Sequence, residues 1–175
     1  MLIMDLDPGD DVNWPAVIDA AMEVRQRLTT SGLAAYVKTS GGKGLHVVTP
    51  LTPKADWAAV KSYAATIARD MATDSPDRYV ATITKSKRGG KILIDYLRNQ
   101  RGQTAVAPYS TRARPGATVS VPLDWAELGP AIGPAHFTVQ NMRQRVATFA
   151  ADPWANFRGD ARPLEPPKQR GKRVL

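Results

Sequence analysis

The sequence contains no cysteine and only two histidines among its 175 residues. The absence of cysteine excludes a disulfide framework, a thiolate zinc site and a thiol nucleophile. No apolar run approaches the ~20 residues that cross a bilayer, so a transmembrane helix is not expected. The acidic start MLIMDLDPGDD also lacks the basic flank of a secretory signal peptide. With thiols absent and imidazoles scarce, carboxylates are the expected ligands of any metal ion.

Positive charge is present in excess, and it is concentrated. The chain has a formal net charge of +8, whereas residues 85–114 alone carry +7 and residues 162–175 carry +4. The rest of the chain is therefore slightly acidic. A basic excess gathered in this way favours a polyanionic partner, nucleic acid rather than a membrane, although a solvated charged surface is the alternative.

The hydrophobic pattern predicts an α+β domain built on a mixed or antiparallel sheet flanked by helices. Apolar residues at helical spacing predict helices over residues 14–30, 53–71 and 139–150, and residues 1–7, 33–39, 45–51, 79–84 and 91–97 are expected strands. Short strands are also expected over 104–110 and 118–121. We expect one core over residues 1–160, followed by a basic, proline-rich tail over 161–175. No GxGxxG or Walker A sequence supports a Rossmann or P-loop fold.

Three acids stand in strand contexts. Asp5 and Asp7 are two residues apart, so on a strand both side chains point to one face while Leu6 points to the other. Asp95 lies within ILIDYL, where burial without a partner would be costly. Two divalent ions shared by the three carboxylates would satisfy them. The alternatives are that Asp5 and Asp7 begin a turn and that Asp95 pairs with a nearby arginine.

The segment SGGKGLH, residues 40–46, is a candidate anion-binding loop. Glycines allow backbone N–H groups to converge on a phosphate, and Lys43 would supply charge while Ser40 and His46 donate hydrogen bonds. Arg112 is placed to reach a triphosphate bidentately, and Arg88, in a glycine-containing loop seven residues before Asp95, fits the same site. A glycine-rich hairpin turn with an exposed lysine, and ordinary surface arginines, are the alternatives.

Four motifs in order resemble one known family. DLDP, KTSGGKGLHVV, GKILIDYLRNQRG and TAVAPYSTRARPGATVSVPLDWAEL are similar to the polymerase domain of bacterial DNA ligase D, within the archaeo-eukaryotic primase superfamily. The resemblance runs from residue 2 to about residue 165 and implies a primase-like catalytic core with an RRM-like sheet. It assigns Asp5, Asp7 and Asp95 as catalytic, metal-binding acids. It assigns Ser40, Lys43, Gly44, His46, Arg88 and Arg112 to nucleotide binding.

The same resemblance implies an activity and partners. A member of this family is expected to use two Mn²⁺ or Mg²⁺ ions and to extend a DNA or RNA primer from NTP or dNTP during non-homologous end joining. The expected partners are DNA, a ligase and an end-binding Ku-type protein, in the bacterial cytoplasm at the nucleoid. Arg98 stands where members of the family often carry a polar amide near the sugar.

The family's domain is longer, and much of the difference precedes the DLDP strand. We therefore expect that this chain lacks the residues that stack on the base and bind a DNA 5′-phosphate. Two alternatives to an active polymerase stay open. In the first, the chain is a non-catalytic nucleic-acid-binding remnant of the fold. In the second, it is one half of a split polymerase that a companion chain completes.

Overall fold

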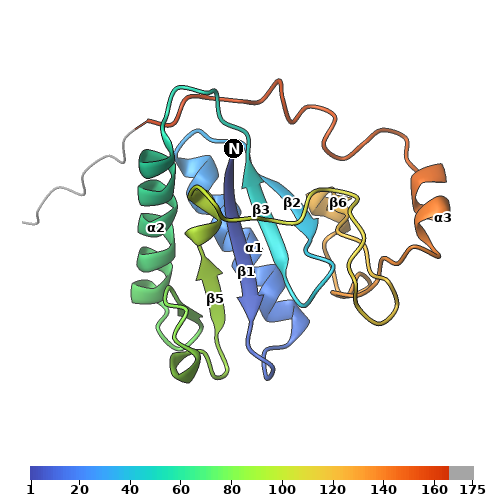
Figure 1. The fold of residues 1–175 in the computed structure, drawn as a ribbon, viewed down its shortest axis with the longest axis horizontal. Helices are drawn as coiled ribbons and strands as arrows, with labels where there is room; N and C mark the ends of the chain where they lie inside the picture. The colour runs from blue at the N-terminus through green and yellow to red at the C-terminus, as the bar shows by residue number, and fades with distance from the viewer. Residues whose placement is uncertain (166–175) are drawn as a thin grey trace, which may run out of the picture.

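A computed structural model describes residues 1–165, and residues 166–175, most of the predicted tail, lie outside the described part. A mixed sheet forms the centre of the molecule (Figure 1). The chain runs through β1 (Leu2–Pro8), α1 (Trp14–Thr30), β2 (Tyr36–Thr39), β3 (Leu45–Thr49), α2 (Trp57–Asp74), β4 (Tyr79–Val80), β5 (Ile92–Asp95), β6 (Pro122–Leu123) and α3 (Met142–Ala147).

The sheet has the strand order β4-β5-β1-β3-β2-β6, in which only β4 and β5 are parallel. Its central part, β5-β1-β3-β2 with helices after β1 and β3, is the βαββαβ arrangement of ferredoxin-like and RRM domains. The predicted α+β fold with an RRM-like sheet is therefore confirmed. β1 is a central strand, so side chains on its two faces meet two different environments.

One face of the sheet is apolar and packs against α1 and α2. Leu2, Met4 and Leu6 of β1 are fully buried in the same cluster as Val24 of α1 and Ile67 of α2. Alternation along β1 places Asp5 and Asp7 on the opposite face. The apolar positions of the two helices thereby fix which side of β1 is left for polar side chains.

The helices begin where side-chain caps allow. The Asn13 side chain accepts a hydrogen bond from the N–H of Ala16 at 3.0 Å, and α1 spans the predicted residues 14–30. Asp56 caps α2 in the same way through Ala59 at 2.7 Å, so this helix begins four residues later than the predicted 53–71 and ends at Asp74.

The expected strands over 104–110 and 118–121 are absent from the described sheet, which has only isolated bridges near them, between Thr111 and Val119 and between Thr118 and Thr138. This segment attaches to β2 through one backbone hydrogen bond, from the N–H of Thr39 to the carbonyl of Val121 at 3.0 Å, and through side chains. The Thr39 hydroxyl oxygen accepts from the N–H of Val121 at 2.9 Å, and the Thr118 hydroxyl donates to the carbonyl of Gly41 at 2.5 Å. Residues 110–121 are thereby held against the end of β2.

The chain's last described part returns to the sheet. The N–H of Thr52 donates to the carbonyl of Arg162 at 3.0 Å, next to a bridge between Leu51 and Arg162. The predicted core boundary at residue 160 thus falls just before a point of attachment. Across the described residues, no helix has the length and apolar character that crossing a membrane requires.

Candidate active site

A row of polar side chains crosses the face of the sheet opposite the helices. In the strand register, Lys38 of β2 lies beside His46 of β3, His46 beside Asp5 of β1, and Asp5 beside Asp95 of β5. Directly opposed residues in an antiparallel pair have Cα atoms about 4.5–5.5 Å apart. The structure therefore brings together Asp5 and Asp95, which are far apart in the sequence.

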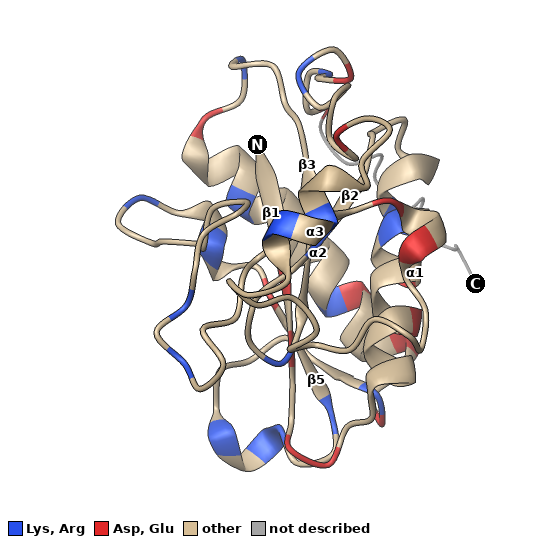
Figure 2. Cartoon of the chain, turned by 90° about the vertical axis from the view of Figure 1, so that its right-hand side faces the viewer, with Lys and Arg blue, Asp and Glu red and all other residues tan. Residues whose placement is uncertain are grey.

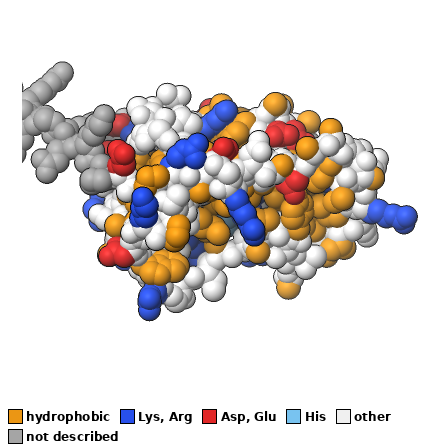
Figure 3. All heavy atoms as spheres, turned by 90° about the horizontal axis from the view of Figure 1, so that it is seen from above, with side chains coloured by type: hydrophobic (Ala, Val, Ile, Leu, Met, Phe, Trp, Pro, Cys, Tyr) orange, Lys and Arg blue, Asp and Glu red, His pale blue; other side chains and the backbone are white. Residues whose placement is uncertain are grey.

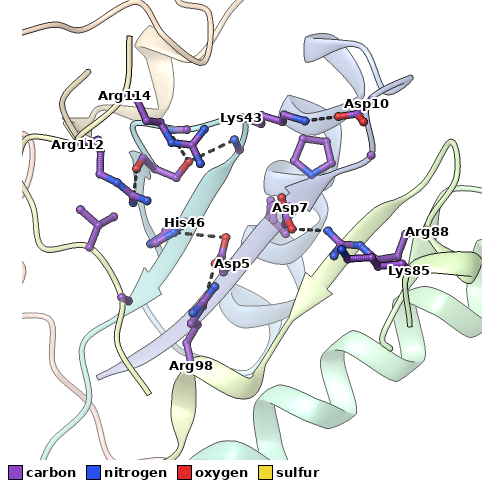
Figure 4. Close-up of a pocket in the computed structure, with 18 of the residues that line it drawn as sticks. Asp5, Asp7, Asp10, Lys43, His46, Lys85, Arg88, Arg98, Arg112 and Arg114 are labelled. Carbon is purple, nitrogen blue, oxygen red and sulfur yellow. Dashed lines mark hydrogen bonds and ion pairs between the residues drawn. The ribbon is translucent and has the colours of Figure 1, made fainter. Parts of the chain in front are cut away.

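A cavity of about 920 Å³ opens beside this row. It is lined by the predicted residues Asp5, Asp7, Ser40, Lys43, Gly44, His46, Arg88 and Arg112. Figure 4 shows the two acids on β1, with Arg88 on one side and Arg112 and Arg114 on the other. Asp95 does not line the cavity; it lies beside Asp5 in the strand register and lines a smaller hollow with residues 81–83, 93, 94, 96 and 97.

The acids of the cavity contact basic side chains. The guanidinium of Arg88 pairs with Asp7, and Lys43 pairs with Asp10 at the rim. Arg98 Nε lies 3.0 Å from Asp5 Oδ2 and 3.3 Å from Asp95 Oδ2, so one guanidinium contacts both carboxylates. The arginine partner that the sequence left open for Asp95 is thus present in the structure.

Burial and these partners move the acid pKa values in opposite directions. Burial acts to raise the pKa of Asp5, but the hydrogen bond and charge of His46 and the charge of Arg98 outweigh it and hold the pKa below its ordinary value. For Asp95, burial dominates and raises the pKa, against the hydrogen bond from the Leu97 N–H and the charge of Arg98. Asp5 is therefore the firmer anion of the pair.

The glycine loop is folded tightly against β1. The Ser40 hydroxyl oxygen accepts from the N–H of Gly42 at 3.1 Å and of Gly44 at 3.3 Å, which closes the turn. A Cβ at Gly44 would lie 1.8 Å from the carbonyl oxygen of Leu6, so only glycine allows this approach. The loop is thereby fixed next to Asp5 and Asp7.

Basic side chains reach the cavity from segments far apart in the sequence. Arg112 Nη1 donates to the carbonyl of Ser40 at 3.3 Å, which joins the 110–121 segment to the glycine loop. Figure 2 shows lysines and arginines on several loops around the sheet, whereas Figure 3 shows them dispersed among apolar and acidic side chains on the face seen from above. Six lysines and arginines and four aspartates line the cavity, so positive charge is in modest excess there.

Lys38 is a titratable residue that the sequence analysis did not select. Its side chain is 2% exposed and its Nζ donates to the Ser120 hydroxyl at 2.7 Å. Burial lowers its pKa to about 7, helped by Arg112 and opposed by Asp5. The signal was present, because Lys38 is a lone charged residue in an apolar strand, two positions before Ser40.

Four further charged residues that line the cavity were given no part in the site by the sequence: Asp10, Asp11, Lys85 and Arg114. Asn99, in contrast, has a structural role. Its side chain accepts from the N–H of Ile3 at 2.8 Å and donates to the carbonyls of Ile3 at 2.7 Å and Tyr96 at 2.9 Å. These bonds fasten the 3₁₀ turn Leu97–Asn99 to β1.

The chemistry of the acids fits hard divalent cations. Asp5 and Asp95 are opposed and Asp7 follows at i+2, and carboxylate oxygens are the ligands that Mg²⁺ and Mn²⁺ prefer. Within residues 1–165, however, no three histidine, cysteine or carboxylate side chains are grouped closely enough to hold one ion. The carboxylates of Asp5 and Asp7 are engaged by arginines, so an ion would require these side chains to move.

Comparison with known proteins identifies relatives that match most of the length of this chain. A family model described as "LigD, primase-polymerase domain" matches residues 1–154. The multifunctional non-homologous end joining protein LigD of Pseudomonas aeruginosa is 40% identical over 158 residues, which are 90% of this chain and 19% of that protein. The bifunctional LigD of Bacillus subtilis is 31% identical over 146 residues, 83% of this chain and 24% of that protein.

A solved structure shows the same fold. The polymerase domain from Mycobacterium tuberculosis ligase D, in complex with DNA, superposes with a TM-score of 0.84 at 35% identity, over 91% of this chain and 55% of that chain. The chain thus spans about half the length of that solved domain and about a fifth of the Pseudomonas protein.

Proposed function

The chain belongs to the LigD primase-polymerase domain family, and we propose that it is a metal-dependent nucleotidyltransferase that extends a primer 3′-hydroxyl from NTP or dNTP. The reaction would be template-dependent and serve non-homologous end joining, as the names of its relatives suggest. The observation that carries the proposal is the opposition of Asp5 and Asp95 across adjacent strands, beside a cavity lined by a glycine loop and arginines.

Asp5, Asp7 and Asp95 would hold two Mn²⁺ or Mg²⁺ ions. Such ions activate the attacking hydroxyl and stabilise the charge that develops on the phosphoryl oxygens. Asp5 is suited to this role because its pKa lies below the ordinary value, which keeps it ionised at neutral pH. Asp95, whose pKa is raised, would become a better ligand as a cation approaches, because positive charge favours its ionised form.

The triphosphate would lie along the glycine loop. Ser40, Gly42 and Gly44 line the cavity wall, while Lys43, Arg88 and Arg112 bring positive charge from three segments. His46 Nε2 lies 3.3 Å from Asp5 Oδ1, so it would position this carboxylate as well as meet the nucleotide. DNA would follow the basic segment 85–114, and a ligase and a Ku-type protein are the proposed further partners.

Primer extension tests this function. We expect the purified chain to add nucleotides to a primer–template in Mn²⁺ and to lose this activity when the metal is chelated. Asp7→Ala should lower incorporation about 10²–10³-fold, the scale of losing one transition-state-stabilising group. Asp19→Ala is the matched control, because Asp19 is exposed on α1, away from the cavity. Equal incorporation by wild type and Asp7→Ala would refute the assignment.

A second candidate is a nucleic-acid-binding domain without turnover. The ion pairs of Asp5 and Asp7 with Arg98 and Arg88 favour it, because these acids are already neutralised. It predicts steeply salt-dependent DNA binding that Mn²⁺ does not change, with no incorporation. Incorporation that appears only when a companion chain is added would instead indicate a split polymerase.

A further inference from the structure

Arg98 occupies the space between two carboxylates that the proposed reaction needs for metal. Its Nε lies 3.0 Å from Asp5 Oδ2 and 3.3 Å from Asp95 Oδ2, and its Nη1 donates to the carbonyl of Thr104 at 3.2 Å. Figure 4 shows the guanidinium directed at Asp5 from the edge of the cavity. The Arg98 side chain is one-third exposed (34%), whereas the side chain of each acid is only 11% exposed.

The two carboxylates require a cation at this place. They face each other in strand register, and like charges directly opposed across strands destabilise a sheet. Their burial increases the repulsion, because water cannot screen it as at the surface. Arg98 supplies the compensating charge in the protein alone, and a divalent ion would supply it in the loaded protein. Arg98 already contacts the carboxylate of Asp5 that would also hold the divalent ion.

The backbone holds Arg98 over the acids. Asn99 anchors the 3₁₀ turn to β1 through Ile3, and the N–H of Leu97 donates to Asp95 Oδ1 at 2.8 Å. Arg98 lies between these two anchored residues in the sequence, so its backbone is held in place beside the acids. The Thr104 carbonyl, in the segment that lines the cavity, gives the guanidinium a contact that does not depend on the acids.

We propose that Arg98 is a positioning residue that competes with divalent cations for Asp5 and Asp95. It keeps the acid pair neutralised and the protein folded before metal binds, and it must move off Asp5 before an ion is bound there. It thereby raises the metal concentration that the site requires. This inference rests on the proposed function, because it takes Asp5 and Asp95 to be metal ligands.

Mn²⁺ binding without nucleotide tests the competition directly, since the electron paramagnetic resonance signal of free Mn²⁺ reports the bound fraction. We expect Arg98→Gln to bind Mn²⁺ about tenfold more tightly than wild type, because a charged hydrogen-bonding competitor is removed. Without metal, Arg98→Gln should melt at a lower temperature, and Mn²⁺ should raise its melting temperature more than that of wild type. A merely structural role would weaken binding rather than tighten it.

Two further variants keep the test decisive. Arg101→Gln removes a positive charge from an exposed side chain of the same segment, so its affinity should stay within about twofold of wild type, as expected for a screened surface charge. Arg98→Lys keeps the charge but not the planar guanidinium, and its affinity should lie between those of wild type and Arg98→Gln. If Arg98→Gln does not fold, Arg98→Lys carries the test.

The outcomes separate the two proposals. If Asp5→Asn abolishes Mn²⁺ binding but neither Arg98 variant tightens it, the competition is overturned and the metal site stands. Equal tightening in Arg101→Gln overturns it too, because the effect is then general electrostatics. If wild type, Asp5→Asn and the Arg98 variants all bind Mn²⁺ equally weakly, the proposed metal site itself fails.

Discussion

The two faces of β1 are built by different rules. On one face Leu2, Met4 and Leu6 are fully buried against helices, and any apolar side chain of suitable volume would satisfy such a position. On the other face Asp5 is 8% exposed as a whole residue and depends on two partners, His46 in the neighbouring strand β3 and Arg98 in the 3₁₀ turn that follows β5. On the first face of the strand, the apolar character of the side chains is what matters. On the second, the strand register matters, because it brings each polar side chain to its partner.

The difference has an energetic consequence. Loss of apolar contacts on the helix-facing side lowers stability roughly in proportion to the volume removed. Loss of one partner on the polar face leaves a buried charge uncompensated, and its effect depends on pH and on available cations. A change of pH or added cations should therefore restore stability after a substitution on the polar face, but not after a substitution on the apolar face.

Gly44→Ala should disturb both faces and cause the largest loss. The added methyl group would meet the Leu6 carbonyl oxygen at 1.8 Å, so β1 or the glycine loop must shift. We expect the free energy of unfolding to fall by at least about 3 kcal/mol, as severe overpacking against backbone does. Urea denaturation measures it. Gly129→Ala, with no atom within 4 Å of the new Cβ, is the control, and equal losses would contradict the close approach.

Met4→Ala should affect the apolar face alone. Met4 is fully buried, and its truncation should cost about 2–5 kcal/mol in the free energy of unfolding. Mn²⁺ affinity at a temperature where the variant is folded should not change. Met22→Ala is the matched control, since Met22 is 42% exposed on α1 and its truncation should cost little. A large change in Mn²⁺ affinity in Met4→Ala would show that the two faces are not independent.

The contrast between the faces also explains what could be predicted from the sequence. Alternation in β1 placed Asp5 and Asp7 on one side, and the apolar spacing of residues 14–30 gave the bounds of α1. Both are local patterns. The opposition of Asp5 and Asp95 depends on the pairing of β1 with β5, and no local pattern carries that register.

The roles of Lys38, Arg98 and Asn99 could not be predicted from local sequence patterns. Lys38 became significant only when β2 was paired beside β3, Arg98 when its guanidinium was found in contact with Asp5 and Asp95, and Asn99 when its side chain was found bound to the backbone of Ile3. In place of the short strands expected over 104–110 and 118–121, the segment forms isolated bridges and side-chain hydrogen bonds such as that from Val121 to Thr39. Hydrophobic periodicity does not report such bonds.

Lys38→Met converts a polar position into an apolar one and should alter the pH dependence of stability. The pKa of Lys38 falls from 10.5 to about 7 on burial. Between these values the unfolded chain binds a proton that the folded chain does not, so wild-type stability rises with pH. The slope is up to about 1.4 kcal/mol per pH unit.

We expect Lys38→Met to lack this slope. Its advantage in unfolding free energy over wild type should therefore shrink from pH 7 to pH 9. Urea denaturation at three pH values measures the slope, and Lys54→Met, at an exposed lysine, should keep the wild-type slope. Parallel pH profiles for wild type and Lys38→Met would show that Lys38 is charged in the folded protein throughout this range.

Lys43→Ala should have the smallest effect on stability and a clear effect on binding. Lys43 is 57% exposed and pairs with Asp10, which is 84% exposed, so water and salt screen the pair and the melting temperature should not change measurably. If Lys43 meets a triphosphate, its loss should weaken nucleotide binding about tenfold, the scale of one charged hydrogen bond. Asp10→Ala, which frees the same ammonium group, should not weaken it. Isothermal titration calorimetry with a nonhydrolysable nucleoside triphosphate in Mn²⁺ measures the affinity of each variant. Equal affinity in wild type and Lys43→Ala would remove Lys43 from the site and leave it an exposed residue of a glycine turn.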